Sequence, residues 1–359
     1  MKNWLATSLT ERLQIRYPLI QAPMAGGITT PQLVAAVSNA GGLGSLAGGY
    51  LEPEQVRAAI AAVRNLTDKP FAVNLFIPEA VTAEPAYIER ANTLLAPYRA
   101  ELGLPPPALP TFAPSHLKEQ MEEQLAVLVE EKVNILSFTF GVPEPKEVAA
   151  LKRWGITLLG TATHLLEAIC LEESGVDIIV AQGAEAGGYR GTFIGPPERG
   201  LVGNMALLPL LTTHLRIPVV AAGGIMNGRG IAAALLGGAA GVQLGTAFLA
   251  CPESGAHPRY KELLAEGTEI NTILTRVFSG RLARSLENRF TTELQAHEAQ
   301  WPGFPVQHLL TRDIRQAAAA QNRPEFMALW AGQGCALCTT KPAAALMEAW
   351  MQQIRELFF

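Results

Sequence analysis

Two glycine-rich segments late in the chain have the composition of a phosphate site. AAGGIMNGRG (Ala221–Gly230) follows an apolar run and opens a helical pattern, and GAAGVQLGTAFL (Gly238–Leu249) repeats this design one unit later. Backbone N–H groups and the start of a helix favour a dianion, and glycine lets the backbone approach it closely. The same glycines could merely permit tight turns, but two consecutive segments favour the phosphate site. Its expected residues are Gly223, Gly224, Gly245 and Thr246.

Other residues that follow apolar runs could surround a planar ring beside that phosphate. Asn74, near the end of FAVNLF, offers both a donor and an acceptor, although it could instead cap a helix. Gln182 begins the most distinctive stretch of the chain, QGAEAGGYRGTF. Small residues in QAPMAG would let a ring lie against backbone, or would form only a turn. These residues are Pro23, Met24, Ala25 and Gly26.

The elements that position these residues alternate along the first two-thirds of the chain. Apolar runs alternate with amphipathic stretches, which is typical of parallel β/α units. Eight strands are predicted, the number that closes a (β/α)8 TIM barrel of the α/β class. They are Pro18–Ala22, Gly42–Leu46, Phe71–Leu75, Ile135–Thr139, Thr157–Gly160, Asp177–Ala181, Val219–Ala222 and Gly241–Leu244. The helices between them include Pro31–Asn39, Glu52–Arg64, Leu117–Glu131, Ala162–Glu173, Met205–Leu215 and Gly228–Leu236.

A doubly wound open sheet is the alternative architecture. It would place a G-x-G-x-x-G segment directly after the first strand. The first strand here runs into QAPMAGG, and the strongest glycine clusters come near the end of the pattern. The sequence therefore favours the barrel.

Three segments describe the expected domain organisation. Residues 1–250 form the barrel, residues 251–340 break the β/α rhythm as a smaller, mainly helical insertion after strand 8, and residues 341–359 form a helix that returns to the barrel. Residues 77–115 are rich in proline and too long for an ordinary connection, so we expect an excursion over the barrel mouth.

The composition excludes several classes of function. The 359 residues carry a formal net charge of −4, which argues against a nucleic-acid partner. No apolar run reaches the roughly 18 residues that span a bilayer, and the N-terminus lacks a signal-peptide pattern. Four cysteines suit a reducing compartment, so we expect a cytoplasmic protein without a membrane partner. Cys335 and Cys338 make at most half a zinc site, so no metal is expected.

Taken together, the motifs resemble those of the nitronate monooxygenases. QAPMAGG, VNLF, SFTFGVP, AQGAEAGGYRGTF, AAGGI and GVQLGTAFL occur in the family's order, followed by TRVFSGRLAR (Thr275–Arg284) and WAGQG (Trp330–Gly334). The resemblance covers nearly the whole chain. It implies that FMN lies at the top of the barrel, and that alkyl nitronates such as propionate 3-nitronate react with O2 to give a carbonyl product and nitrite. The implied cofactor-binding residues are Asn74, Gln182, Gly187, Gly224, Gln243, Leu244, Gly245 and Thr246, to which we add the neighbouring Gly188 and Gly223.

One position departs from the family pattern. The family reads EAGGH, with the histidine toward the flavin and the substrate, whereas this chain has Tyr189. A histidine titrates near pH 6.5 and can accept a proton at neutral pH, while a tyrosine, near 10, mostly cannot. Tyr189 can still donate a hydrogen bond to an anion, and is our catalytic candidate. His164 is offset from a second family histidine by about one turn, with Glu167 nearer, so we expect His164 to be a capping or surface residue.

A nitronate is already deprotonated, so its oxidation needs no base. The protein must place the anion and stabilise it electrostatically. We expect Tyr189, Arg190 and Ser137 or Thr139 as polar wall residues, and Phe76 and Phe138 as apolar ones, although any of these could belong to the core.

Two other functions remain open at this point. An FMN-dependent enoyl-acyl-carrier-protein reductase would share the barrel and an EAGGH-type loop, but would use a nicotinamide cofactor and an acyl tunnel. A flavin-binding module without turnover is the second, because Tyr189 replaces the usual polar group. The expected partners are a small-molecule nitronate and O2, and the expected state is a monomer or homodimer.

Overall fold

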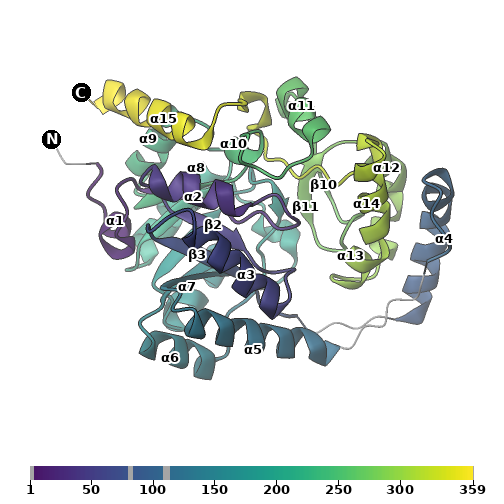
Figure 1. Cartoon of the computed structure of the whole chain (residues 1–359), viewed down its shortest axis with the longest axis horizontal. Coiled ribbons are helices and arrows are strands. Elements are labelled where there is room, and N and C mark those ends of the chain that lie inside the picture. The colour runs from purple at the N-terminus through teal and green to yellow at the C-terminus, as the bar shows by residue number, and fades with distance from the viewer. Residues whose placement is uncertain (1–3, 80–83, 108–113, 359) are drawn as a thin grey trace.

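Eight parallel strands close into a barrel in the computed structural model, which describes residues 4–79, 84–107 and 114–358 (Figure 1). The strand order is β1-β9-β8-β6-β5-β4-β3-β2, and a bridge between Ile20 and Leu43 joins the two ends. Each predicted run overlaps one strand, so the predicted (β/α)8 fold is confirmed. The strands are β1 (Leu19–Gln21), β2 (Gly44–Ala47), β3 (Phe71–Phe76), β4 (Ile135–Thr139), β5 (Thr157–Ala162), β6 (Ile178–Gln182), β8 (Val219–Ala222) and β9 (Gly241–Leu244).

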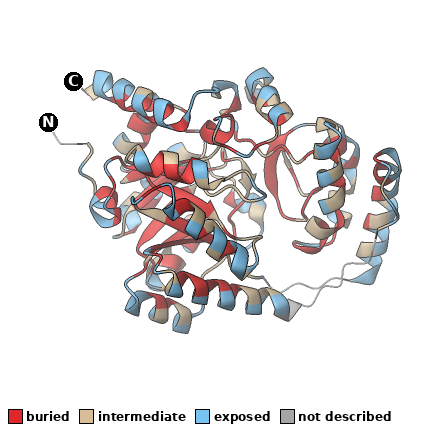
Figure 2. Cartoon of the chain, in the orientation of Figure 1, coloured by how far each residue is buried: buried red, intermediate tan, exposed pale blue. Residues whose placement is uncertain are grey.

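Helices cover the outside of the barrel, with their buried faces against the strands and their exposed faces outward (Figure 2). Two of them begin at N-cap residues whose side chains accept a hydrogen bond from the first turn: Thr30 for α2 and Asn227 for α9. The C-terminal helix α15 lies against α9 and α2. These helices are α2 (Pro31–Asn39), α3 (Pro53–Arg64), α5 (Pro114–Glu130), α6 (Pro145–Arg153), α7 (Leu165–Glu173), α8 (Asn204–His214), α9 (Gly228–Leu236) and α15 (Ala343–Phe358).

Side chains fill the barrel interior. Ile20, Leu159, Ile178 and Val220 from four strands are buried in one cluster. Leu9 of α1 (Ser8–Leu13) joins this cluster and closes the N-terminal end of the barrel. Space for a ligand is therefore left at the carboxyl ends of the strands.

The segment after β9 lies beside the barrel (Figure 1), and its buried side chains form a second hydrophobic core. It contains several helices and also an antiparallel pair of strands that the sequence analysis did not expect. This pair continues into β7 (Gly188–Tyr189), in the loop after β6, so the insertion is joined to the barrel mouth by a three-stranded sheet. Its elements are α10 (Thr246–Leu249), α11 (Pro258–Glu266), β10 (Thr272–Thr275), β11 (Ala283–Leu286), α12 (Arg289–Leu294), α13 (Val306–Leu310) and α14 (Arg312–Ala320).

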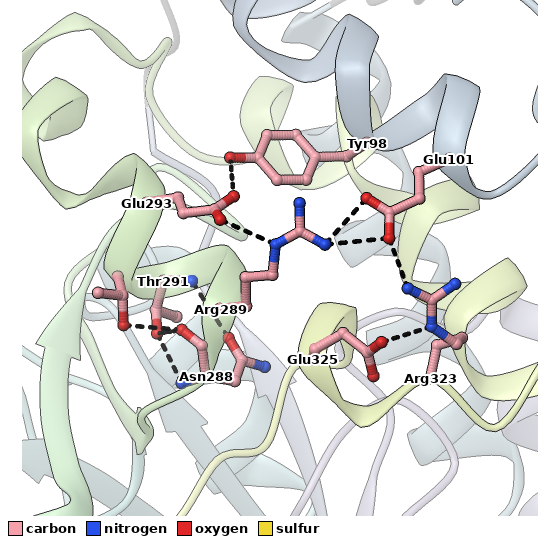
Figure 3. A network of polar contacts seen from close by, with 9 residues as sticks. Tyr98, Glu101, Asn288, Arg289, Thr291, Glu293, Arg323 and Glu325 are labelled. Atoms are coloured by element: carbon pink, nitrogen blue, oxygen red, sulfur yellow. Dashed lines mark hydrogen bonds and ion pairs between the residues drawn. The ribbon is translucent and has the colours of Figure 1, made fainter.

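The excursion after β3 also belongs to this second core. Its helix α4 (Pro85–Glu101) lies beside α13 rather than across the barrel mouth, and buries Leu95 and Tyr98 against the insertion. Figure 3 shows the polar contacts at this junction: the carboxylate of Glu101 forms ion pairs with Arg289 at 2.9 Å and with Arg323 at 2.6 Å. Exposed ion pairs of this kind contribute little each, so the buried apolar side chains hold α4 in place.

Candidate active site

One cavity of about 1200 Å³ lies at the carboxyl ends of the barrel strands, between the barrel and the insertion. Its size exceeds the roughly 300–1000 Å³ of most small-molecule sites, so it has room for a mononucleotide and a small substrate together. The residues expected to bind the cofactor, together with Tyr189, lie on its wall: Pro23, Met24, Ala25, Gly26, Asn74, Gln182, Gly187, Gly188, Tyr189, Gly223, Gly224, Gln243, Leu244, Gly245 and Thr246. Their roles toward a ligand stay predictions.

We call the part of the wall formed by the ends of β1, β8 and β9 and the loops after them the glycine side. Gly223 and Gly224 have φ of +107° and +72°, and a Cβ at Gly223 would lie 2.8 Å from the backbone nitrogen of Ala186. Asn204 donates from its side-chain amide to two carbonyl oxygens of this loop, at 3.1 and 2.7 Å. Glu185 accepts from the backbone of Asn204 at 2.9 Å. Backbone of fixed shape therefore forms this wall.

The second glycine loop is fastened by the insertion. Thr246 accepts through Oγ1 from the backbone of Gly332 at 3.0 Å, and its carbonyl accepts from the Cys338 thiol at 3.2 Å. Gly26, in the loop after β1, and Gly188, in the loop after β6, have φ of +82° and +73°, and a Cβ at either would meet nothing within 4 Å. The glycine side thus combines close-packed backbone with open space in front of it.

Two amide side chains among the predicted residues are fixed by protein groups. Asn74 donates to Ser137 at 2.9 Å and is buried. Gln182 donates to the carbonyl of Tyr189 at 2.8 Å and accepts from the backbone of Gly191 at 2.8 Å. Gln182 therefore holds the loop that carries Tyr189.

Tyr189 belongs to a second part of the wall, which we call the aromatic side and which consists of Tyr50, Phe76, Phe140, Tyr189, Phe304, His308, Arg315 and Trp330. The phenol oxygens of Tyr189 and Tyr50 are 2.6 Å apart. Tyr50 stacks on His308 with ring centroids at 4.5 Å and an interplanar angle of 22°. The rings of Phe140, Phe304 and Trp330 approach that of Tyr189 to 5.8, 5.8 and 5.5 Å. Two phenols thus lie in an otherwise largely apolar box.

His308 is held as a neutral hydrogen-bond donor. Arg315 donates to the carbonyl of His308 at 2.9 Å and lies 3.2 Å from its Nδ1. Because a guanidinium only donates, Nδ1 must accept, and the ring hydrogen lies on Nε2. Burial lowers the pKa of His308 well below 6.5, and the charges of Arg315 and Arg312 lower it further. His308 is therefore uncharged at neutral pH, with its basic nitrogen occupied.

Tyr50 is also uncharged at neutral pH. Burial raises its pKa well above 10, and the neighbouring Tyr189 adds to the shift. The aromatic side therefore presents hydroxyl donors rather than a proton acceptor, an arrangement suited to an anionic oxygen.

Two of the expected wall residues have structural roles instead. Arg190 is fully buried and donates to the carbonyl oxygens of Gln182 at 2.8 Å, Gly183 at 2.7 Å and Gly200 at 2.9 Å. Phe138 is fully buried within the barrel core. Strand alternation explains the second case, since Ser137 and Thr139 line the cavity and the residue between them faces the other way.

The alternative bases lie elsewhere, since neither is among the described residues that line the cavity. His164 occupies the N-cap position of α7 without a side-chain capping bond, and its Nε2 is 3.1 Å from the carbonyl of Ile194. Glu167 is fully buried, and its carboxylate accepts from the backbone of Thr163 at 2.7 Å and of Phe193 at 2.5 Å. Glu167 therefore ties a loop to α7.

Sequence reasoning missed most of the aromatic side, above all Tyr50, His308 and Arg315. Tyr50 lies three residues after the end of a barrel strand, and loops at that end usually supply functional residues, so this rule could have found it. His308 and Arg315 come from the insertion, and no local pattern connects them to a barrel loop.

Three further features concern metal binding, the cysteine thiols and membrane-spanning helices. In the described part of the chain, no group of three or more His, Cys, Asp or Glu residues could hold a metal ion. Burial raises the pKa of the Cys338 thiol to about 12, so this thiol is protonated at neutral pH. Among the described helices, none has both the length and the apolar character needed to cross a membrane.

Comparisons with known proteins identify the family of the chain. Residues 6–353 match the family described as nitronate monooxygenase. A probable nitronate monooxygenase of Staphylococcus aureus (strain Newman) is 41% identical over 355 residues, which cover 99% of each chain. The structure of nitroalkane oxidase from Streptomyces ansochromogenes is 42% identical with a TM-score of 0.89, over 97% of this chain and 98% of that one. FabK from Thermotoga maritima is more distant, at 30% identity and a TM-score of 0.76 over 98% and 97%. The chain is therefore an oxidoreductase that belongs to the nitronate monooxygenase family.

Proposed function

We propose that this protein uses FMN to oxidise alkyl nitronates, such as propionate 3-nitronate, with O2 to a carbonyl product and nitrite. The observation that carries the proposal is one cavity with two unlike walls. Its glycine side offers backbone to a phosphate and a ring, and its aromatic side offers two phenols to an anion. Membership of the nitronate monooxygenase family supports the reaction.

The residues present fit FMN. A Cβ at Gly26 or Gly188 would project into open space, as expected where a ring lies close to backbone. The phosphate would be held by Gly223, Gly224, Gly245 and Thr246, and the ring by Pro23–Gly26, Asn74, Gln182, Gly187, Gly188, Gln243 and Leu244. FMN, when bound there, supplies the acceptor for the electrons of the nitronate. We favour FMN over a dinucleotide flavin because no G-x-G-x-x-G segment follows the first strand.

The protein's own part in the reaction is placement. Tyr189 donates a hydrogen bond to the nitronate anion, and the surrounding rings of Phe140, Phe304 and Trp330 exclude water. A hydrogen bond to an anion is stronger where water is excluded.

The residues of the aromatic side also indicate which form of the substrate, the nitroalkane or its nitronate, is preferred. A neutral nitroalkane must first lose the proton on its α-carbon, which requires a base. The similar Streptomyces structure is that of a nitroalkane oxidase, but position 189 here is a tyrosine, and Nδ1 of His308 already accepts from Arg315. We therefore propose that pre-formed nitronates are the better substrates. A cytoplasmic location and a monomeric or homodimeric state stay predictions from the sequence.

Two assays on the purified protein test the proposal. Oxygen consumption with propionate 3-nitronate should be rapid, while NADH consumption with a crotonyl thioester should be absent. Mass analysis of the cofactor released on denaturation should identify FMN. Turnover of the thioester alone would favour the enoyl-acyl-carrier-protein reductase, and bound FMN without turnover in either assay would favour a binding module.

A further inference from the structure

Tyr50 and Tyr189 meet across the cavity although they are 139 positions apart in the chain. Tyr50 comes from the loop after β2, and Tyr189 comes from β7, in the loop after β6. Their oxygens are 2.6 Å apart, so one phenol donates to the other. Local chain geometry does not require this meeting, since separate elements hold each ring.

The loop that carries Tyr50 is fastened on two sides. Gln124 of α5 donates to the carbonyl oxygens of Gly48 at 3.1 Å and Leu51 at 2.6 Å, which bracket Tyr50 in the chain. On the other side, the ring of His308 stacks on the ring of Tyr50, and Arg315 fixes His308. The orientation of the Tyr50 ring is therefore set before any substrate binds.

Tyr189 is held equally firmly. Its backbone pairs with Ala283 of β11, and its carbonyl accepts from Gln182 at 2.8 Å. Both phenols are thus preorganised, which lowers the entropic cost of binding a ligand.

We propose that Tyr50 and Tyr189 form a two-phenol clamp for the O–N–O group of the substrate, with His308 and Arg315 as positioning residues. The clamp rests on the proposed function, since it names the residues that would recognise a nitronate. A nitronate carries two oxygens on one nitrogen, and two hydroxyl donors a short distance apart match that pair. Hydroxyl hydrogens rotate, so the phenols can exchange their mutual bond for one bond each to the anion.

The chemistry of the wall favours this use over a resting contact between two phenols. Both phenols face the cavity, and the pKa of Tyr50 is raised, so it carries its hydrogen at neutral pH. The positive charges of Arg315 and Arg281 act on Tyr50 and partly oppose the rise of its pKa, and such charges also favour an anion beside it. Each phenol that donates to an anion contributes a charge-assisted bond, whose loss weakens binding by about 10- to 100-fold.

Nitrite is a suitable probe because it has the same O–N–O group and cannot be oxidised as a nitronate. Its Kd is measured by calorimetry on the holoenzyme and on the Tyr50→Phe and Tyr189→Phe variants. We expect each variant to bind nitrite about 10- to 100-fold more weakly, with unchanged flavin content and circular dichroism. Tyr87→Phe is the matched control, since Tyr87 lies exposed on α4, and its variant should bind nitrite as the native protein does.

His308 is tested by a pair of substitutions. His308→Phe keeps a ring against Tyr50, and His308→Ala removes it. If His308 positions Tyr50, the alanine variant binds nitrite more weakly than the native protein, and its KM for the nitronate rises by a larger factor than its kcat falls. The phenylalanine variant then has the nitrite affinity and the KM of the native protein. Equal nitrite affinity in the alanine variant and the native protein would remove His308 from the proposal.

The outcomes separate the clamp from the proposed function. Native nitrite affinity in Tyr50→Phe would overturn the clamp, whether or not nitronates are oxidised. Failure of the native protein to bind nitrite, with nitronates still oxidised, would also overturn it and leave the function standing. Weakened nitrite binding in both tyrosine variants, without any nitronate turnover, would support the clamp and overturn the function. If Tyr50→Phe fails to fold, Tyr189→Phe and the His308 pair decide.

Discussion

The two sides of the cavity are built on different principles. On the glycine side, two consecutive β/α units of one barrel supply backbone whose shape is fixed by left-handed glycines such as Gly223 and Gly224. On the aromatic side, Tyr50, Tyr189 and His308 come from a barrel loop, a short strand and an inserted helix. The glycine side therefore presents mainly backbone to the cavity, while the aromatic side presents side chains. A substitution at position 189 therefore changes the aromatic side and leaves the backbone of the glycine loops after β8 and β9 as it is.

The two sides are joined at one place. A Cβ at Gly187 would collide with the backbone of Ala331 and Gly332, so the loop that leads to Tyr189 packs directly on the insertion. Gly332 in turn bonds Thr246 on the glycine side. Substitutions on one side of the cavity, with measurements of both flavin content and substrate turnover, thus test whether the two sides are independent.

The largest effect is expected from Gly224→Asp, which should abolish FMN retention. The substitution places a negative charge where the phosphate dianion is proposed to lie, so the two like charges repel each other. The flavin content of the purified variant, from its absorbance, measures the effect.

Gly155→Asp is the matched control for backbone strain. Gly155 has φ of +73°, against +72° for Gly224, and a Cβ there would meet nothing within 4 Å. We expect the Gly155 variant to retain FMN. A well-folded Gly224→Asp protein with a full complement of flavin would show that the phosphate does not lie at this loop.

The next largest effect concerns the aromatic side and the protonation of the substrate. Without a base in the position of Tyr189, kcat/KM near pH 7 should be about 10²- to 10⁴-fold higher for a nitronate than for its parent nitroalkane. Tyr189→His should narrow this ratio by providing a base. Comparable efficiency of the native enzyme on both forms would mean that another residue takes the proton.

A smaller effect is expected from Tyr189→Phe. The loss of one charge-assisted hydrogen bond, worth about 1.5–3 kcal/mol, should lower kcat/KM for the nitronate by about 10- to 100-fold. Flavin content should not change, because the substitution alters no contact of the glycine side. A parallel loss of flavin would show that the two sides are not independent.

The smallest effect concerns the titration of His308. Its pKa in the folded protein lies below the value near 6.5 of an unfolded chain, so the unfolded state binds more protons as the pH falls below about 6.5. This residue therefore lowers the stability of the native protein as the pH drops from 7 toward 5. The free energy of unfolding, measured with denaturant at pH 7 and at pH 5, should fall less for His308→Phe than for the native protein. An equal or larger loss in that variant would mean that His308 is charged in the folded state.

The sequence by itself determined the barrel and the glycine side. Apolar runs such as Phe71–Leu75 and Val219–Ala222 could only be buried strands, and their number and spacing close a barrel. The glycines lie within a few positions of their strands, so a local pattern was enough to place Gly223, Gly224 and Gly245 at one mouth. The substitution at Tyr189 was also visible, because a motif surrounds it.

Only the tertiary structure decided what surrounds Tyr189. The partnership of Tyr50 with Tyr189 and the stacking of His308 on Tyr50 join segments that are far apart in the chain. The pairing of β11 with β7 brings the insertion to the barrel mouth, and neither strand is long enough to be recognised from periodicity. The roles of Arg190 and Phe138 depended on which way each side chain turns within a packed wall. Local patterns specify backbone, whereas contacts between side chains that are distant in sequence are set by how whole elements pack.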